Sequence, residues 1–311
     1  MPDFPLIDSH QHVFWNGRDD YGLVADLDEH RIEKAWLLTW DEPKSEATGT
    51  YMQRMDPRHK LNGSVETMIP LHNIIDVARR FPDRFIAGYC PHPMDPHAVD
   101  KLQAAVDIHG VQVCGEWKFT MMFDDPRCLE IYRYAGTRNL PVVLHLDVAY
   151  LPPNGGAFVG HGQWKGGGID TLIRALEACP DTNFIGHAPG FWREMAADAD
   201  NYPEQYLKPP MKIGGRLPDV FDTYPNLYAD LSAGSALKTL MADPENAYAF
   251  LTRFEDRLLF ARDYYGGELI AFLDSLNLPD STWRKIGREN AEKLIANTAP
   301  PNSAPLRKLG L

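Results

Sequence analysis

The segment FPLIDSHQH, residues 4–12, carries the pattern that decides the fold. A short apolar run leads into polar residues, which is typical of a buried strand whose carboxyl end reaches a functional surface. Similar short, β-rich runs recur along the whole chain. They give eight strand candidates: residues 4–8, 34–40, 85–89, 111–116, 142–145, 183–187, 226–230 and 257–263.

Helical signals fill the segments between these strands. Asp-Pro pairs at residues 95–96 and 125–126 combine a capping aspartate with a first-turn proline, and they predict two helix starts. Apolar residues spaced three and four apart predict a helix over 168–178. A longer patterned stretch covers 236–254, and its internal Pro244 should mark a break or a new start.

Strand and helix therefore alternate through the 311 residues, which predicts a mostly parallel sheet covered by helices. Eight units favour the α/β class with a single (β/α)8 TIM barrel, spanning residues 1–296 and followed by a tail at 297–311. No glycine-rich dinucleotide motif follows the first strand, which weakens an open doubly wound sheet. Long loops after strands 2, 5 and 6 (residues 41–68, 147–168 and 188–216) should lie on the catalytic face.

Charge and cysteine content exclude several classes of function. The formal net charge of −12 argues against nucleic acid or an anionic membrane as the main partner. The four cysteines are scattered without a C-x-x-C pair, which indicates a reducing compartment. No signal peptide or membrane-spanning segment is visible. We expect a cytoplasmic enzyme with a small-molecule substrate, which can also form a homo-oligomer.

Polar residues at the strand ends carry the chemistry. His10 and His12 are two apart on the first strand, so their side chains point to the same side. His145, His187 and Asp263 each end another apolar strand. Any one of them alone could cap the following helix. Together, on one face of a barrel, they predict a shared site.

Imidazole nitrogens and a carboxylate are suitable ligands for a divalent metal ion, most simply Zn²⁺. A catalytic site leaves one position open for water, and the metal lowers the pKa of that water to roughly 7. A carboxylate such as Asp263 can then take a proton from the attacking water and later deliver it to the leaving group.

These motifs resemble the amidohydrolase superfamily. His10-x-His12, His145, His187 in IGHAPG and Asp263 in LFARDY are most similar to the amidohydrolase family 2 branch. The similarity runs from Leu6 to about Leu294, where ENAEKL resembles the closing helix of that branch. The branch includes hydrolases, lactonases and decarboxylases such as aminocarboxymuconate-semialdehyde decarboxylase.

The resemblance implies a role for each matching residue. His10, His12 and Asp263 would bind the metal, with His145 as a further ligand. His187 would either bind a second ion or polarise the substrate, and Asp263 would also shuttle the proton. One or two ions are compatible with this set.

Two further positions stay open. Glu116 and Lys118 share one face of the fourth strand, so Glu116 is either a metal ligand or the partner of Lys118 in an ion pair. In the first case Lys118 would bind a substrate carboxylate. Arg262 either forms a structural pair or holds an anionic substrate.

The main hypothesis is a metal-dependent hydrolase that cleaves an ester, lactone or amide of a small carboxylate-bearing metabolite with metal-activated water. The first alternative is a metal-dependent non-oxidative decarboxylase of an aromatic or muconate-type acid. A lactonase without metal and a barrel that binds without catalysis are the other two. Residue patterns alone do not separate these four.

Overall fold

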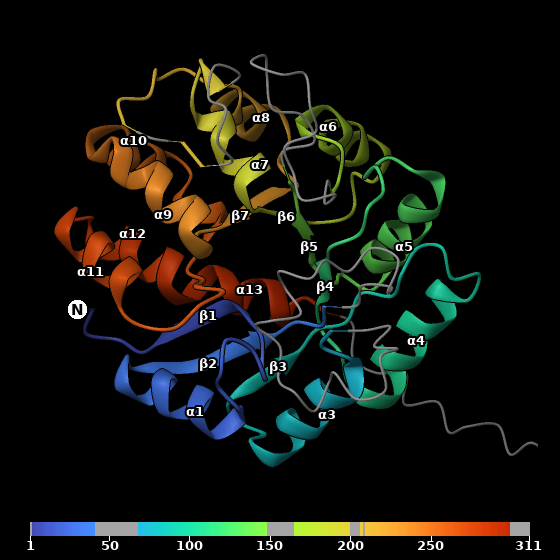
Figure 1. Cartoon of the computed structure of the whole chain (residues 1–311). Helices are drawn as coiled ribbons and strands as arrows, with labels where there is room; N and C mark the ends of the chain where they lie inside the picture. Colours follow the sequence, from blue (N-terminus) through green and yellow to red (C-terminus); the bar gives the residue numbers. More distant parts are fainter. Residues whose placement is uncertain (1, 41–67, 148–164, 200–205, 208, 299–311) are drawn as a thin grey trace, which may run out of the picture.

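The described part of the computed structural model comprises residues 2–40, 68–147, 165–199, 206–207 and 209–298, and it forms a barrel of parallel strands inside a ring of helices (Figure 1). The strands are β1 (Leu6–Gln11), β2 (Ile32–Leu37), β3 (Phe85–Ala87), β4 (Cys114–Trp117), β5 (Val142–His145), β6 (Phe184–His187), β7 (Leu227–Asp230) and β8 (Leu258–Leu259). Every pair of adjacent strands is parallel, within the two sets β1–β3 and β4–β8.

Backbone hydrogen bonds join the two strand sets into a ring. Just after β3, Tyr89 N donates to Val113 O at 2.9 Å, directly before β4. Just after β8, Phe260 O accepts from Ser9 N of β1 at 3.0 Å, and Asp263 N donates to His10 O at 2.9 Å. The expected barrel architecture is confirmed, and its closure brings the last strand end beside the first.

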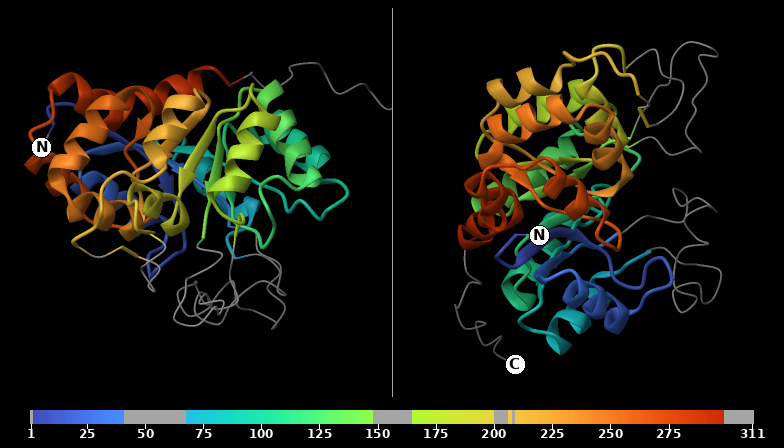
Figure 2. Two further views of the ribbon diagram at one scale, coloured as in Figure 1. Left: turned by 90° about the horizontal axis from the view of Figure 1, so that it is seen from above. Right: turned by 90° about the vertical axis from the view of Figure 1, so that its left-hand side faces the viewer.

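Helices cover the outside of this ring, as Figures 1 and 2 show. They are α1 (Asp20–Glu29), α3 (Leu71–Arg80), α4 (Ala98–His109), α5 (Pro126–Thr137), α6 (Ile169–Ala178), α7 (Pro189–Trp192), α8 (Leu217–Thr223), α9 (Ala233–Ala242), α10 (Pro244–Arg253), α11 (Glu268–Ser275), α12 (Asp280–Arg284) and α13 (Asn290–Ala296). The helix expected at 168–178 is α6. The break expected at Pro244 separates α9 from α10, where Asp243 caps the new helix by accepting from Asn246 N at 2.9 Å.

The two predicted Asp-Pro helix starts differ in outcome. Asp125 accepts from Arg127 N at 3.0 Å, and α5 begins at the adjacent proline as expected. The helix predicted from Asp95 begins later, at Ala98, because the Asp95 carboxylate accepts from His97 N at 2.8 Å and closes a local turn first. Asp95 therefore caps the turn that precedes the helix.

Two large clusters make up most of the core. Alternating strand residues such as Val143 and Ile185 fill the barrel interior, and Ala291 and Leu294 of α13 belong to the same cluster. The opposite strand faces pack against the surrounding helices. Because His145 lies two residues after Val143, and His187 two after Ile185, the alternation directs both imidazoles toward the barrel axis.

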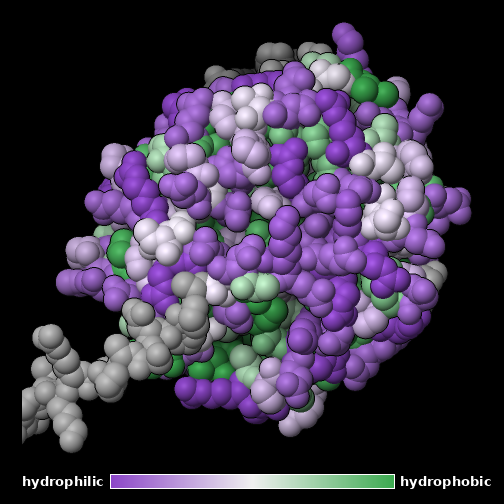
Figure 3. Space-filling model, turned by 180° about the vertical axis from the view of Figure 1, so that it is seen from behind, coloured by the Kyte–Doolittle hydropathy of each residue, from purple (hydrophilic) through white to green (hydrophobic). Residues whose placement is uncertain are grey.

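The outer surface agrees with the charged composition. Figure 3 shows one face dominated by hydrophilic side chains, with its largest apolar area low in the centre and smaller ones elsewhere. None of the helices in the described ranges is long and apolar enough to cross a bilayer. The loops expected at 41–68 and 147–168 lie largely outside the described residues, as does the tail after residue 298. The loop expected at 188–216 is described except for 200–205 and 208, and it begins with the short helix α7.

Candidate metal centre

Side chains from β1, β4, β6 and the segment after β8 converge at the carboxyl end of the barrel. The ligand atoms of His10, His12 and Asp263 all lie within 4.8 Å of one another, and so do those of His10, Glu116 and His187. His12 Nε2 is 3.2 Å from Glu116 Oε2 and 3.4 Å from Asp263 Oδ1. The strand ends expected to share a site therefore meet.

Three atoms at this centre are buried without a hydrogen bond among the described residues: His10 Nε2, His12 Nε2 and Glu116 Oε2. Buried polar atoms without partners are costly, so such a cluster needs an explanation. Two ligands that each lie about 2 Å from one tetrahedral ion are roughly 3.3 Å apart. The spacings of His12 to Glu116 and Asp263 match that value, and the donor set therefore fits a divalent metal ion.

The carboxylate of Asp230 orients two of the imidazoles. It lies 2.8 Å from His10 Nδ1 and 3.0 Å from His187 Nδ1, while His12 Nδ1 lies 3.0 Å from the Leu38 carbonyl oxygen. Each of these oxygens accepts a hydrogen bond from Nδ1–H, which keeps the proton on Nδ1 and leaves the Nε2 lone pair for a metal. Burial opposes the charge on Asp230, but His187 and His10 outweigh it and hold the pKa of this carboxylate far below its ordinary value.

Glu116 is fully buried and ionised. Burial would raise its pKa, yet Lys118, His145 and His12 hold that pKa well below the ordinary value. His187 Nε2 lies 3.7 Å from Glu116 Oε1 and 3.9 Å from Asp263 Oδ2. Glu116 thus stands between the imidazoles of β1 and β6, where a carboxylate can bridge two ligand groups. Whether it binds a metal remains a prediction.

His145 lies differently from the expectation. Its Nδ1 is 2.6 Å from Glu116 Oε1 and its Nε2 is 3.1 Å from Asp147 Oδ1. With both nitrogens engaged by carboxylates, it belongs to neither ligand group among the described residues. Burial would raise the pKa of Asp147, but His145, Lys165 and Lys118 lower it. In this arrangement His145 supports Glu116, and its expected role as a direct ligand stays a prediction.

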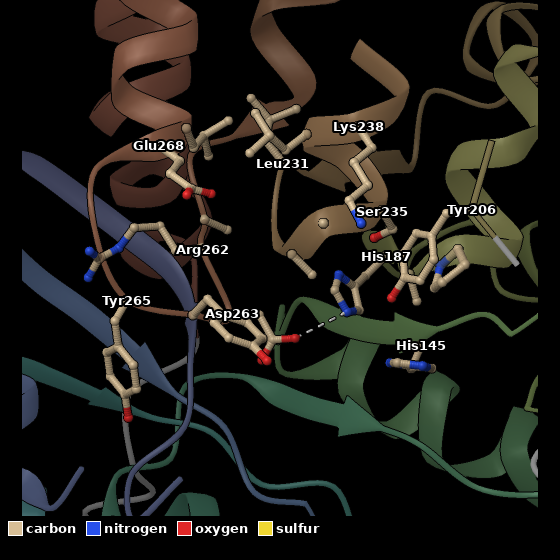
Figure 4. A pocket seen from close by; sticks show the side chains of 18 of the residues that line it. His145, His187, Tyr206, Leu231, Ser235, Lys238, Arg262, Asp263, Tyr265 and Glu268 are labelled. Atoms are coloured by element: carbon tan, nitrogen blue, oxygen red, sulfur yellow. Dashed lines mark ion pairs between the residues drawn. The ribbon is translucent and has the colours of Figure 1, made fainter. Parts of the chain in front are cut away.

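Arg262 is held in a structural pair. Its Nε lies 2.7 Å from Asp8 Oδ2 and its Nη2 lies 2.8 Å from Asp26 Oδ2. Figure 4 shows the guanidinium turned away from Asp263. Asp8 also accepts from the Arg262 backbone N at 3.0 Å and from His10 N at 3.3 Å. The structural alternative for Arg262 is therefore favoured over substrate binding, because its charge is already matched.

A cavity of about 540 Å³ opens above the ligand groups (Figure 4). Asp263, His187 and His145 form its base, and Lys118 lies in its wall. Lys118 is 3% exposed, and its ammonium group sits 3.7 Å from the centre of the Trp40 ring and 3.6 Å from Glu116 Oε2. The cavity can therefore receive a small molecule with its anionic group beside the metal ligands.

Sequence reasoning missed several residues of this site. Asp230 ends β7, and the strand-end signal that identified His187 would have found it. Asp147, just beyond β5, carries the same signal. Tyr206 and Lys238 also line the cavity, but Lys238 lies inside α9 and Tyr206 far from any strand end, so no sequence pattern marks them.

Comparisons with known proteins support the fold. No protein-family model and no curated protein matches the sequence. An uncharacterised TIM-barrel protein from Bordetella bronchiseptica aligns with a TM-score of 0.59 at 18% identity, over 89% of this chain and 82% of that one. A dihydroxybenzoic acid decarboxylase from Polaromonas, with bound manganese and the inhibitor 2-nitroresorcinol, aligns with a TM-score of 0.60 at 17% identity, over 94% and 97%.

A proposed amidohydrolase from Staphylococcus aureus aligns with a TM-score of 0.59 at 16% identity, over 94% of this chain and all of that one (100%). These neighbours share the TIM-barrel architecture that the sequence predicted, and the resemblance to the amidohydrolase branch stays a prediction. At these identities the likeness shows the architecture and leaves the reaction to be argued from the site.

Proposed function

We propose that this chain is a metal-dependent enzyme of the amidohydrolase family 2 branch that decarboxylates a small aromatic or muconate-type acid without an oxidant. The observation that carries the proposal is the convergence beside Asp263 of three buried atoms that make no hydrogen bond among the described residues: His10 Nε2, His12 Nε2 and Glu116 Oε2. The structural neighbours include decarboxylases of aromatic acids, two of them with bound manganese, which favours this reaction over hydrolysis.

His10, His12 and Asp263 would hold a divalent ion, with Glu116 as an additional ligand. Either Mn²⁺ or Zn²⁺ suits this mixture of imidazole and carboxylate donors. When bound, the ion supplies positive charge that holds an anionic substrate and stabilises charge developing on it. The oriented imidazoles need no rearrangement to bind it, because Asp230 and the Leu38 carbonyl oxygen already fix their tautomers.

The chain's own residues would bind the substrate and move one proton. Lys118 binds an anionic group of the acid from the cavity wall. The bond between the ring or chain carbon and its carboxyl group breaks, carbon dioxide leaves, and the electron pair stays on carbon. That carbon then takes a proton from the carboxyl group of Asp263, which is reprotonated from solvent.

The test is a carbon dioxide assay on protein loaded with Mn²⁺, using 2,6-dihydroxybenzoate, 5-carboxyvanillate and related acids. Asp263→Asn should lower turnover by at least ~100-fold, because general acid–base catalysis contributes about 10²–10⁴-fold. Asp222→Asn, which changes an exposed carboxylate of α8 paired with Arg253, should leave the rate unchanged. Equal rates in wild type and Asp263→Asn would refute the assignment.

Hydrolysis is the second candidate. It is favoured by the His-x-His pair at the carboxyl end of β1, whose two Nε2 atoms lie near Asp263, an arrangement that suits activation of a water molecule. Release of acid from a lactone or ester, with no carbon dioxide from any acid, would identify the hydrolase. Metal analysis of the same samples tests the hypothesis of a lactonase that works without metal. Such an enzyme would keep full activity with less than one equivalent of metal ion bound per chain.

A further inference from the structure

We propose that Lys238 and Tyr206 form a second anion-binding subsite in the cavity, so that the substrate is a dicarboxylic acid. The proposal rests on the proposed function, since the first carboxylate is the one held beside the metal ligands and Lys118. It adds that a second carboxylate, at the other end of the substrate, is recognised by a cation on helix α9.

Lys238 is placed to bind an anion. Its ammonium group lines the cavity and lies 4.8 Å from the centre of the Tyr206 ring. Among the described residues, neither a carboxylate nor a hydrogen-bonding group pairs with it, and the Tyr206 ring is its electrostatic contact there. A lysine that stacks on an aromatic face keeps its remaining donors available, since the ring occupies only one side of the ammonium group.

Of the other cavity cations, Arg262 is paired with carboxylates on both sides, and Lys118 is the one proposed to face the first carboxylate. Arg262 is matched by Asp8 and Asp26, and Lys118 lies 3.6 Å from Glu116. Lys118 directly follows β4, whereas Lys238 stands on α9, as Figure 4 shows for the latter. Two ammonium groups on different elements suit a ligand with two separated anionic groups better than a ligand with one.

Tyr206 adds a hydrogen-bond donor next to Lys238. Burial and the nearby carboxylates of Asp263 and Asp147 raise the pKa of the phenol, so that it stays protonated and can donate to an anion. Figure 4 shows Tyr206 and Lys238 on the same side of the pocket, near His187. An ammonium and a phenol together suit the two oxygens of a carboxylate.

Glu268 makes the two ends of the cavity differ in charge. It lines the same cavity and lies beside Arg262 in Figure 4, on the side away from Lys238. A negative charge there repels a second carboxylate, so the favourable place for that group is the Lys238 side. The cavity volume of about 540 Å³ is ample for an aromatic ring with two carboxyl groups.

The experiment measures binding by calorimetry on the full chain loaded with Mn²⁺, with benzoate as the monocarboxylate and isophthalate and terephthalate as dicarboxylates. Wild type should bind the better dicarboxylate at least about 10-fold more tightly than benzoate. Lys238→Met should remove that preference while changing benzoate affinity by less than about twofold. Lys238→Arg should keep most of it, and Tyr206→Phe should lose part of it.

Glu268→Gln is the matched control, because it also removes one cavity charge but should not weaken dicarboxylate binding. Equal losses for benzoate and dicarboxylates in Lys238→Met, or no dicarboxylate preference in wild type, would overturn the subsite. The proposed function fails separately, if benzoate binds equally well with and without Mn²⁺. If no acid binds at all, both proposals are refuted.

Discussion

One carboxylate, Asp230, orients two imidazoles of the centre. It lies 2.8 Å from His10 Nδ1 and 3.0 Å from His187 Nδ1. Replacing a carboxylate that orients a metal-binding histidine costs about 10–100-fold in metal affinity. Because two rings depend on Asp230, we expect Asp230→Asn to weaken Mn²⁺ binding by at least ~10-fold in a competition assay with a chelating dye.

Asp222→Asn, on the surface of α8, should bind Mn²⁺ as wild type does. Circular dichroism of Asp230→Asn should still show a folded barrel, because the amide keeps one hydrogen bond to an imidazole. Unchanged Mn²⁺ affinity in that folded variant would mean that Asp230 does not orient the ligands.

Single residues also show where sequence reasoning stops. His10, His12, His187 and Asp263 could be placed from sequence, because each follows an apolar run whose end has a fixed position in a barrel. The ion pairing of Arg262 could not be predicted from sequence, because its partners Asp8 and Asp26 lie more than 230 positions away along the chain. A long-range ion pair leaves no periodic mark in the sequence.

At the scale of elements, the residues just after β5 and helix α7 pack closely together beside the site. Gly190 N donates to Leu146 O at 2.7 Å, and a Cβ atom at Gly190 would lie 2.4 Å from the Asp147 carbonyl oxygen. Overpacking of this kind costs about 1–3 kcal/mol. We expect Gly190→Ala to lower the free energy of unfolding by that amount in denaturant titration.

The matched substitution is Gly234→Ala in α9, where the nearest atom to an added Cβ is 3.6 Å away. There alanine should be neutral or stabilise by up to about 1 kcal/mol, because it favours the helix. If both alanine variants had the same stability, the contact between α7 and the β5 loop would not be tight.

The elements themselves were largely predictable. Eight strands and the break at Pro244 follow from periodicity and from proline chemistry. The late start of α4 was not predictable, because the Asp95 carboxylate can cap either a helix or a turn and the choice depends on His97. The irregular pairing of β1 with β2 between Asp8 and Gln11 was also hidden, although it lies directly beside the two histidines.

At the scale of the whole molecule, the proposed ion would tie together β1, β4 and the segment after β8, which lie far apart in sequence. A ligand present at 100 times its dissociation constant stabilises the folded state by about 2.7 kcal/mol. We therefore expect removal of metal by a chelator to lower the melting temperature by roughly 4 °C, and added Mn²⁺ to restore it.

Differential scanning calorimetry would measure this shift. His12→Ala lacks one ligand, and its melting temperature should no longer respond to Mn²⁺. A wild-type protein that melts at one temperature with and without metal would argue against a resident ion. Sequence alone could predict the barrel that makes this coupling possible, but not its strength, which depends on distances such as the 3.2 Å between His12 and Glu116.

Asp263 adopts a left-handed backbone conformation with φ at 53°. Among residues with a side chain, asparagine and aspartate tolerate this region best. Aspartate and asparagine codons differ by one nucleotide, so a single mutation can remove the carboxylate while leaving the local chain path intact. A mutation of Asp263 to asparagine can therefore end catalysis at little cost to folding. Homologues that keep the barrel but only bind small acids are an evolutionary outcome to look for.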